Sequence, residues 1–483
     1  MGNSKKSNML VYAHYYHPDV ASTGQILKEL CEGLKDRFNI TVICVVPSYT
    51  GVIEDKYKEK KYYNEDINGI KVIRVRVPEF EKGNKKSRII NLLSYFFRAI
   101  WATFKCGKQD YIFSISQPPI LGGVLGVIGK WIKHGKFIYN IQDFNPEQTI
   151  AVGYTKKQFI LKPAMWVDKF SCRRADKVIV VGRDMQETLR NRFNNKKVPC
   201  NTFINNWINE KEIYPLQEDN EKVMAFKKKY GLDGKTVIMY SGNIGLYYDL
   251  ENLIKVIGKF KDRKDVVFAF IGEGTVKQIL VDYVEEHNLE NVKFIPYQPK
   301  EDLIYSLNAG DIHWVVNAKG IKGVSVPSKL YGVMAAGKTV LGVLEEGSEA
   351  RLIIEDCKCG VCIEPGKYDE VYEKLKDILD NIKEYKSIYE NNFTINEIMH
   401  INQSLNPFKE FIKIWTFKEA YVKMIGTGLS TPLSSFDVIK KSSDFKILTT
   451  EYKRAVISVC CDCSCSNITI IPVTLEEIVK FYN

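Results

Sequence analysis

Short runs rich in β-branched and aromatic residues alternate with helical patterns along most of this 483-residue chain. Such alternation is typical of a parallel sheet covered by helices, because parallel strands need a long crossover connection. The alternation occurs in two series, which are separated by the polar stretch Asn205–Asn220. We therefore expect an α/β protein with two doubly wound parallel sheets.

The strands and helices of the two series can be placed by their periodicity and by their turn residues. In the first series the predicted strands are Met9–His14, Ile40–Val46, Val72–Val77, Tyr111–Ser114, Phe137–Ile141 and Lys177–Val181, and the predicted helices are Gly24–Arg37, Ile89–Lys105 and Pro163–Arg174. In the second series the strands are Thr236–Tyr240, Val266–Ile271, Val292–Ile295, Ile312–Val316 and Thr339–Val343, and the helices are Leu250–Phe260, Val276–His287, Glu301–Asn308 and Lys329–Ala336. No G-x-G-x-x-G motif follows the first strand, which argues against a nicotinamide cofactor.

The composition and the periodicity of the sequence change after about Leu405. A Lys-rich helical segment, Phe408–Met424, is followed by Gly426, Gly428 and Pro432 and then by alternating strand-like runs. We expect domains at 1–200 and 201–404, and a small α+β segment at 405–483. A unit of about 80 residues is near the size at which a hydrophobic core becomes marginal without a partner.

Three turns of the second series are candidates for binding a phosphorylated ligand. Ligands of open α/β sheets bind beyond the carboxyl ends of the strands, so turns that follow several strands can face one crevice. Glycines in such turns let the backbone approach a ligand, and lysines supply positive charge to a diphosphate. The expected binding residues are Gly242, Asn243, Gly245, Gly272, Glu273, Gly274, Ser328 and Lys329, with Lys277 one turn into its helix.

These turns, in this order, resemble retaining glycosyltransferases of family 4, and the resemblance covers about residues 8–400. The bacterial polysaccharide and O-antigen branch is particularly similar, on three N-terminal motifs: Tyr16-His-Pro-Asp-Val-Ala-Ser-Thr-Gly24, Ser116-Gln-Pro-Pro119 and Asp143-Phe-Asn-Pro-Glu147. The resemblance implies the GT-B fold, with two Rossmann-like domains facing a cleft, the first for the acceptor and the second for the donor. It also implies a nucleotide-diphosphate sugar donor, retention at the anomeric carbon, transfer without a metal ion, and a lipid-linked or glycan acceptor of surface polysaccharide (lipopolysaccharide or capsule).

The sequence departs from that family at one point. Many members carry two glutamates eight positions apart around the Lys329 helix, and Val324 and Gly332 occupy those places here. The Pro-Ser-Lys variant suggests that Lys329 takes over part of their role.

Four residues are candidates for catalysis. Lys329 and Lys277 can stabilise the negative charge that develops on the leaving diphosphate. Asp143 and Glu147 follow a predicted strand, and they can orient the acceptor hydroxyl or receive its proton. The alternative is that Asp143 caps the next helix, with Glu147 in its first turn.

Further residues of the first half are assigned by their positions. Ser22, Thr23 and Gly24, at the first strand-to-helix turn, can approach the donor phosphate or the acceptor, and we expect His14 and His17 to be structural. In this family a same-face substitution is expected, in which the leaving phosphate helps to deprotonate the acceptor.

The formal charge of +11 favours an anionic partner, which can be a nucleic acid, a membrane or a phosphorylated substrate. The apolar stretch Ile89–Cys106 follows the basic residues Lys82, Lys85, Lys86 and Arg88, which is the order of a helix at a membrane surface. The alternative is a helix packed on a sheet with a solvated basic lead-in. We expect no nucleic-acid partner, no signal peptide, reduced cysteines, and a cytoplasmic protein peripheral to the inner face of the cell membrane.

The C-terminal segment resembles a different family. Trp415-Thr-Phe-Lys-Glu-Ala-Tyr-Val-Lys423 is similar to the W-x-x-K-E-A-x-x-K signature of the larger, pseudo-dimeric phosphopantetheinyl transferases. The resemblance implies Mg²⁺ at Glu419, phosphates of coenzyme A at Lys418 and Lys423, and an acyl carrier protein as partner. The Asp-x-Glu pair and the preceding half domain of that family are missing, so we expect an incomplete, inactive transferase.

Two other hypotheses remain open on the sequence. The chain can be a carrier-protein modifier or docking module led by its C-terminus, or a nucleotide-sugar sensor that binds without turnover. Cys460, Cys461, Cys463 and Cys465 suggest zinc, but they also continue a strand-like run.

Overall fold

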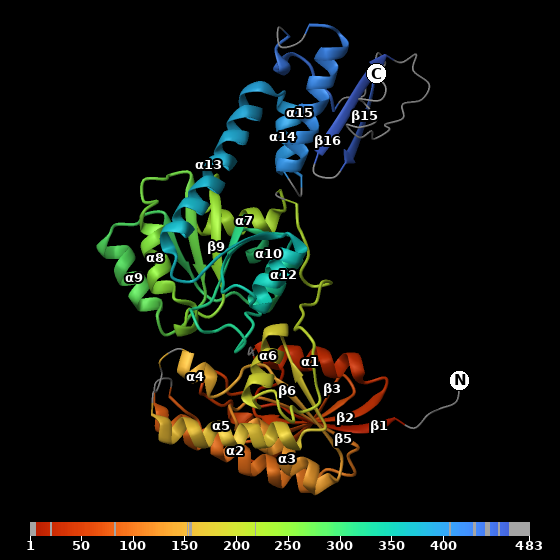
Figure 1. The fold of residues 1–483 in the computed structure, drawn as a ribbon, viewed down its shortest axis with the longest axis vertical. Helices are drawn as coiled ribbons and strands as arrows, with labels where there is room; N and C mark the ends of the chain where they lie inside the picture. Colours follow the sequence, from red (N-terminus) through yellow and green to blue (C-terminus); the bar gives the residue numbers. More distant parts are fainter. Residues whose placement is uncertain are drawn as a thin grey trace. The chain divides into compact units, whose positions relative to one another are not determined.

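The computed structural model describes residues 6–19, 22–81, 84–151, 153, 157–217, 219–404, 407–427, 431–439, 445–452 and 455–462. The chain divides into two compact units (Figure 1). One unit comprises Met1–Tyr214 with Tyr230–Val371, and the other comprises Pro215–Lys229 with Tyr372–Asn483. The first unit holds both predicted sheets.

The first sheet of the described chain has eight strands in the order β3-β4-β2-β1-β5-β6-β7-β8. All neighbours pair in parallel except β3 and β4, which are antiparallel. The strands are β1 (Ser7–Tyr12), β2 (Phe38–Val45), β3 (Tyr62–Ile67), β4 (Ile70–Val75), β5 (Tyr111–Ile115), β6 (Lys136–Ile141), β7 (Lys177–Val180) and β8 (Asn201–Phe203). The helices are α1 (Ser22–Leu34), α2 (Lys85–Lys105), α3 (Leu121–Lys133), α4 (Glu147–Ala151), α5 (Gln158–Arg174) and α6 (Arg183–Arg192).

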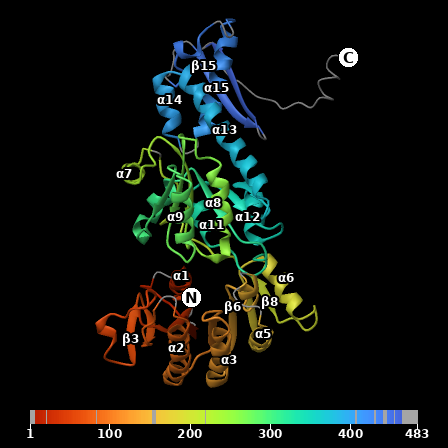
Figure 2. The ribbon, with the colours of Figure 1, turned by 90° about the vertical axis from the view of Figure 1, so that its left-hand side faces the viewer.

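The second sheet has six parallel strands in the order β11-β10-β9-β12-β13-β14. They are β9 (Thr236–Ser241), β10 (Val266–Ile271), β11 (Val292–Ile295), β12 (Ile312–Val316), β13 (Thr339–Val343) and β14 (Gly360–Ile363). Helices surround this sheet (Figure 2); they include α8 (Leu250–Gly258), α9 (Lys277–Glu286), α10 (Leu303–Asn308), α11 (Lys329–Ala335) and α12 (Glu349–Cys357). All residues of β10 and β12 are buried, which is why their sequences are continuous apolar runs.

The prediction of two parallel-sheet halves is confirmed, and most predicted elements lie within a few residues of their observed bounds. Helix α3 was not predicted from the sequence, because its glycines disfavour a helix by propensity. Those glycines allow close packing on the sheet, because a Cβ at Gly126 would lie 2.0 Å from the Phe137 ring, and one at Gly129 would lie 2.7 Å from the Tyr12 hydroxyl. A local rule was thus overridden by tertiary packing.

The second unit packs around a small core of its own. It contains α7 (Glu221–Lys229), most of α13 (Tyr368–Asn392), α14 (Ile395–Asn402), α15 (Pro407–Met424) and the antiparallel hairpin β15 (Phe445–Tyr452) and β16 (Ala455–Asp462). The core residues are Tyr389, Phe393, Ile401, Phe411, Ile414 and Val438. Cys460 donates to the Met424 sulfur at 3.5 Å; the side chain of Cys461, and Cys463, Cys465 and Gly428, lie outside the described residues.

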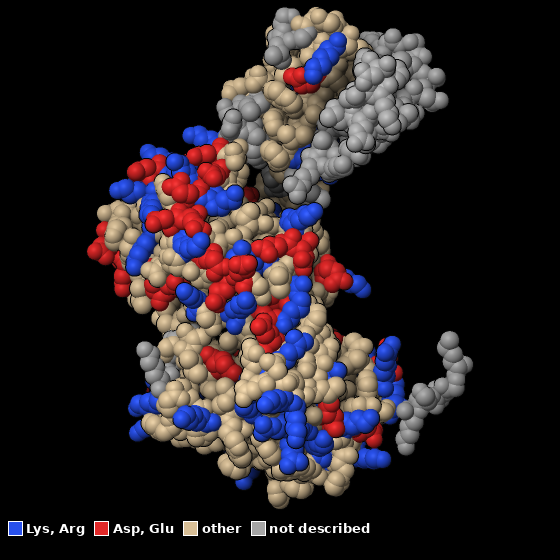
Figure 3. All heavy atoms as spheres, in the orientation of Figure 1, with Lys and Arg blue, Asp and Glu red and all other residues tan. Residues whose placement is uncertain are grey.

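Charged side chains are unevenly spread over the face seen in Figure 3. Acidic and basic residues mix over the second sheet and its helices, whereas Lys and Arg predominate over α3 and α5, low in the view. Among the described residues, no helix is both long enough and apolar enough to cross a membrane.

The packing of α3 can be tested with a pair of glycine substitutions. Gly126→Ala places a methyl group against Phe137, so we expect a loss of about 1–3 kcal/mol of stability, seen as a lower thermal midpoint. Gly33 lies in α1 with no atom within 4 Å of an added Cβ, so Gly33→Ala is the matched control, and its midpoint should stay or rise. Equal effects of the two substitutions would contradict the packing explanation.

Candidate functional site

A polar cavity of about 200 Å³ lies where turns from both sheets of the first unit meet. From the first half it is lined by residues that follow β1, β5 and β6, and from the second half by residues that follow β9 and precede α11. Those bearing on the chemistry are Thr23, Gln117, Gln142, Asp143, Gln148, Asn243, Tyr248, Ser325 and Ser328. The carboxyl ends of strands from both sheets thus converge here, and of the turns predicted for the donor, those at Asn243 and Ser328 line the cavity.

Lys329, the first residue of α11, is held beside this cavity by two tyrosines. Its Nζ donates to the Tyr240 hydroxyl at 2.6 Å, and lies 3.9 Å and 3.7 Å from the ring centroids of Tyr240 and Tyr248. The Tyr240 hydroxyl in turn donates to the Asn243 carbonyl at 2.7 Å. Desolvation by these rings lowers the pKa of Lys329 well below its ordinary value, so an anion brought to this ammonium is strongly favoured.

The glycine turns after β9 and β10 pack against each other. Gly242 and Gly272 have φ of +143° and +138°, which favours glycine. A Cβ at Gly272 would lie 2.0 Å from the Gly242 carbonyl oxygen, and one at Gly274 would lie 2.0 Å from that of Ile244. Gly272 and Gly274, in the turn after β10, therefore allow the two turns to pack together. Gly242 leaves open space beside Lys329.

The amide groups of these turns are mostly used within the turns. Gly242 N donates to Ile271 O at 2.9 Å, and Ile244 N donates to Glu273 O at 2.9 Å. Gly245 precedes a short 3₁₀ turn, Leu246–Tyr248, which brings Tyr248 over Lys329. The conformation of the turns thus positions the tyrosine and the lysine.

Lys277 and Glu273, both predicted for the donor site, contact each other. Lys277 Nζ lies 2.7 Å from Glu273 Oε1, one helical turn away, and neither residue lines the polar cavity. An exposed pair of this kind contributes little to stability. Lys277 is therefore engaged by Glu273 away from the cavity lining, whereas Lys329 directly follows Ser328, which lines the cavity.

Asp143 lines the cavity and bridges the two halves of the unit. It forms an isolated antiparallel bridge with Ser325, and Phe144 N donates to Val324 O at 2.9 Å. Its carboxylate is hydrogen-bonded to the Ser325 side chain, and burial raises its pKa. Helix α4 begins at Glu147, so Asp143 lies four residues before it and faces the cavity.

Glu147 is bound within the first domain. Its two carboxylate oxygens accept from Nε and Nη2 of Arg192, the former at 2.6 Å. Arg192 is 2% exposed and also pairs with Asp168, which accepts from the Tyr139 hydroxyl at 2.8 Å. The structure thus gives Glu147 a fold-stabilising partner rather than a place among the residues that line the cavity.

The first strand-to-helix turn contributes Thr23 to the cavity. Its hydroxyl donates to Gln117 Oε1 at 2.8 Å, which joins the turns after β1 and β5. A Cβ at Gly24 would lie 3.2 Å from the Tyr15 carbonyl oxygen, so this glycine permits a close approach of the backbone. The side chain of Ser22 lies outside the described residues. His14 is buried and beside the rings of Tyr15 and Tyr95, which accords with a structural place.

Two acidic residues that the sequence reasoning missed join the two halves. Asp184, at the start of α6, accepts from the backbone N–H groups of Met185, Gly323 and Glu349, at 2.8, 2.8 and 3.1 Å. The Glu349 side chain, 1% exposed, accepts from Arg183 and pairs with its guanidinium at 3.0 Å. The sequence offered one local indication of their roles, which is that each lies in the first turn of its helix, Asp184 in α6 and Glu349 in α12.

The positions where many relatives carry two glutamates are used for packing here. Val324 is buried, and its carbonyl accepts from Phe144. Gly332 is buried within α11, where a Cβ would lie 3.3 Å from a methyl group of Leu307. A side chain at Gly332 would need this Leu307 methyl group to give by a few tenths of an ångström.

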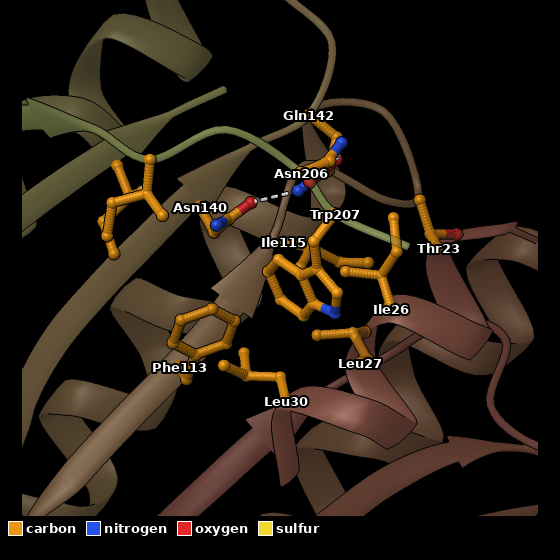
Figure 4. A pocket seen from close by; sticks show the side chains of 12 residues that line it. Thr23, Ile26, Leu27, Leu30, Phe113, Ile115, Asn140, Gln142, Asn206 and Trp207 are labelled. Atoms are coloured by element: carbon orange, nitrogen blue, oxygen red, sulfur yellow. Dashed lines mark hydrogen bonds between the residues drawn. The ribbon is translucent and has the colours of Figure 1, made fainter. Parts of the chain in front are cut away.

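An apolar cavity of about 70 Å³ lies next to the polar one and shares Thr23, Gln142 and Asn206 with it (Figure 4). Trp207 fills one side of it, and its indole N–H donates to Glu29 at 2.9 Å. Gln142 donates to Asn140 at 2.6 Å and accepts from Asn206 at 2.8 Å. This amide chain separates the apolar floor from the polar cavity.

The C-terminal candidate residues do not converge on a metal site. Lys418 is fully buried, and its Nζ lies 2.8 Å from Glu397 Oε2 and donates to the carbonyls of Leu433 and Phe436. Glu419 lies on the exposed side of α15, with Lys423 at 3.3 Å. Across the described part of the chain, no three His, Cys, Asp or Glu residues are grouped so that they could hold a metal ion.

Two families match the sequence. Residues 222–394 match "Glycosyl transferases group 1", and residues 372–464 match "4'-phosphopantetheinyl transferase superfamily". The second match begins in α13, earlier than the boundary expected at 405.

Individual proteins are similar over more than half of the chain. The probable glycosyltransferase WbjE of Pseudomonas aeruginosa is 29% identical over 291 residues, which cover 58% of this chain and 70% of that protein. The putative colanic acid biosynthesis glycosyl transferase WcaI of Escherichia coli K12 is 25% identical over 383 residues, covering 77% and 92%. The solved structure of Anabaena HepE with UDP-glucose matches with a TM-score of 0.54 and 13% identity, over 84% of this chain and 97% of that one, which shows the same fold, GT-B.

The contrast between Glu147 and Asp143 can be tested by stability. Glu147→Gln removes one of two counter-charges from Arg192, so we expect a loss of about 1–3 kcal/mol of stability, measured by thermal or denaturant unfolding. Asp143→Asn is the control: because its carboxylate is desolvated without a paired cation, its loss should leave stability unchanged or raised. The opposite ranking of the two variants would contradict these placements.

Proposed function

Because the chain belongs to the group 1 glycosyltransferases, which have the GT-B fold, we propose that it moves a sugar from a nucleotide-diphosphate sugar to a lipid-linked glycan with retention at the anomeric carbon. Both relatives with printed roles are glycosyltransferases, and one is named for colanic acid, which supports a place in surface polysaccharide biosynthesis. The observation that carries the proposal is Lys329, a desolvated ammonium beside a polar cavity lined by both halves of the unit.

The donor diphosphate is assigned to Lys329. The rings of Tyr240 and Tyr248 keep water away from the Lys329 ammonium, and this desolvation destabilises its charged form. A bound diphosphate would restore the electrostatic stabilisation of the charge. Gly242 leaves room for the ligand, since a Cβ there would lie 3.6 Å from Lys329 Cε. HepE was solved with UDP-glucose, which makes UDP-sugars the first donors to try.

The acceptor hydroxyl is assigned to the first half of the cavity, near Asp143 and Thr23. In the transfer, the bond from the anomeric carbon to the diphosphate oxygen breaks and a bond to the acceptor oxygen forms. The acceptor proton passes to the leaving diphosphate, whose charge Lys329 stabilises. Burial raises the pKa of Asp143, and this carboxylate orients the acceptor hydroxyl as a hydrogen-bond acceptor.

A groove of about 350 Å³ between α4 and α5 supports a lipid-linked acceptor. Helix α4 separates it from the polar cavity, because Gln148 lines the cavity and Ile150 lines the groove. The groove has apolar walls, including Leu161, Met165 and Trp166, with basic residues at Lys162, Lys169 and Arg173. An acyl or polyprenyl chain with a phosphate suits this combination.

Lys329→Met tests the donor site against a matched lysine. We expect turnover, measured as nucleotide diphosphate released from nucleotide sugars with a glycan acceptor, to fall about 10²–10³-fold, because a cation that stabilises the leaving group is lost. Lys277→Met removes a lysine that is paired with Glu273 outside the cavity. Its turnover should therefore fall less than about tenfold, because a solvated charge pair contributes little. Undiminished transfer by Lys329→Met would refute the assignment.

The pH dependence of UDP binding gives a second readout for the same pair. The pKa of Lys329 is lowered in the free protein and rises when a diphosphate contacts the ammonium, so binding takes up a proton above the lowered pKa. Affinity is then constant below that pKa and weakens as pH rises through it, in calorimetric titrations that run from acid pH up to the ordinary lysine range. Lys277→Met should keep this dependence and Lys329→Met should abolish it. Tight binding without any turnover would instead favour a sensor.

The match of residues 372–464 favours a second candidate, modification of a carrier protein with coenzyme A by the C-terminal segment. The buried pairing of Lys418 with Glu397 and the exposed position of Glu419 weigh against a complete site among the described residues. We expect no consumption of coenzyme A when the full chain is mixed with Mg²⁺ and an apo carrier protein. Consumption that Glu419→Ala abolishes would establish this activity instead.

A further inference from the structure

Helix α2 exposes its apolar side and buries its polar side. Ile89, Leu93, Phe97 and Trp101 recur every four residues, and with Ile90 and Phe104 they form one exposed stripe. Phe97 and Trp101 are 64% and 58% exposed. A soluble surface helix ordinarily has the reverse arrangement.

The inward residues of α2 explain its orientation. Asn91 donates to the Pro78 carbonyl at 2.7 Å, Tyr95 donates to Ile43 O at 3.3 Å, and the Thr103 hydroxyl lies 2.6 Å from that of Tyr12. These bonds fix the rotation of the helix about its axis, because buried polar groups need partners. The aromatic stripe is therefore held outward by the fold.

The exposed apolar surface continues over α3 and α5. Helix α3 contacts α2 on one side and α5 on the other (Figures 1 and 2). Trp131 of α3 lies 6.3 Å from Phe170 of α5, and Trp166 stacks on Phe170 at 6.1 Å. Trp131 and Trp166 are 54% and 65% exposed, and Phe159 at the start of α5 is also exposed. We call the exposed side of α2, α3 and α5 the three-helix face.

The charge on the three-helix face is almost entirely positive. The sole acidic residue of these helices is Asp168, which is buried and paired with Arg192. The exposed basic residues are Lys85, Lys86, Lys105, Lys162, Arg173 and Arg174. Figure 3 shows this surface, over α3 and α5, as basic and uncharged side chains.

We propose that the three-helix face binds the surface of an anionic lipid bilayer, with the aromatic side chains in the interface and the lysines and arginines at the headgroups. The combination of exposed aromatic and basic residues matches both parts of an interfacial lipid layer. A second copy of the chain fits less well, because a two-fold contact would bring two basic faces together. Helix α2 lies along the interface, with its exposed apolar stripe toward the lipid.

The role of this membrane contact in catalysis rests on the proposed function, because it concerns the lipid-linked acceptor. Trp166 and Lys162 belong both to the three-helix face and to the groove next to α4. Binding the bilayer through this face brings the groove to the lipid phase, so a lipid-linked acceptor reaches the polar cavity without leaving the membrane. The contacts that carry the inference lie within the first domain and do not depend on the acceptor's identity.

Vesicle sedimentation with the full chain tests the proposal. The protein should sediment with phosphatidylcholine vesicles that contain phosphatidylglycerol, more weakly with phosphatidylcholine alone, and less as salt is raised. The double substitution Phe97→Ser and Trp101→Ser, which changes two exposed rings of α2 outside the groove, should lower the partition coefficient at least about tenfold. Tyr297→Ser is the matched control. It removes a 60% exposed ring from the half of the first unit that holds the second sheet, so this variant should bind as the wild type does.

Further measurements distinguish the alternatives. Lys85→Glu with Lys86→Glu should weaken binding to anionic vesicles with unchanged thermal unfolding, since both side chains are exposed in the first turn of α2. Wild-type binding by the Phe97 and Trp101 variant, or no binding by the wild type, overturns the proposal. So does light scattering in which that variant converts a dimer to a monomer, because the face would then be a self-association surface. Transfer to a detergent-solubilised acceptor should persist in these variants, so failure of the proposed activity is measured separately.

Discussion

The ammonium of Lys329 determines how the turns around the site are arranged. Its partners among the described residues are a hydroxyl and two aromatic rings, and the attraction of a cation to an aromatic face offsets part of its desolvation. Tyr240 ends a buried strand and Tyr248 follows in the next turn, so the lysine can be enclosed only if Gly242 keeps its φ of +143°. Gly272 must then lack a side chain to let the second turn pack on the first.

Carboxylates of the first unit are divided between holding the fold and facing the cavity. Glu147 and Asp168 neutralise the buried Arg192, and Asp184 and Glu349 join loops of the two halves. Each of these has a cation or backbone N–H groups as partner, which a buried carboxylate requires. Asp143 differs, because its side-chain partner is the hydroxyl of Ser325, and a carboxylate without a paired cation at a cavity is suited to an incoming hydroxyl.

The sequence predicted the sheets better than the site. Fully buried parallel strands such as β10 and β12 are continuous apolar runs, so their positions follow from composition. The edge strand β3, Tyr62–Ile67, is polar and was missed, as was the glycine-rich α3. Lys329, Asp143 and Thr23 could be placed near one cavity because strand ends converge. The partner of Glu147 could not be predicted, because Arg192 is distant from it in sequence. The partner of Lys277 was not predicted, because Glu273 was expected to bind the donor.

The C-terminal segment illustrates why a motif can persist without a site. Lys418 and Glu397 are both fully buried, 2.8 Å apart, and Glu397 also forms a capping box with Thr394 at the start of α14. Removing one partner of such a pair leaves a buried charge, at a cost of about 3–5 kcal/mol. The lysine of the W-x-x-K-E-A-x-x-K pattern is therefore required by the packing of α14 against α15. The buried pairing with Glu397 accounts for this lysine, whereas Glu419, 27% exposed, and Lys423, 75% exposed, pair with each other nearer the surface.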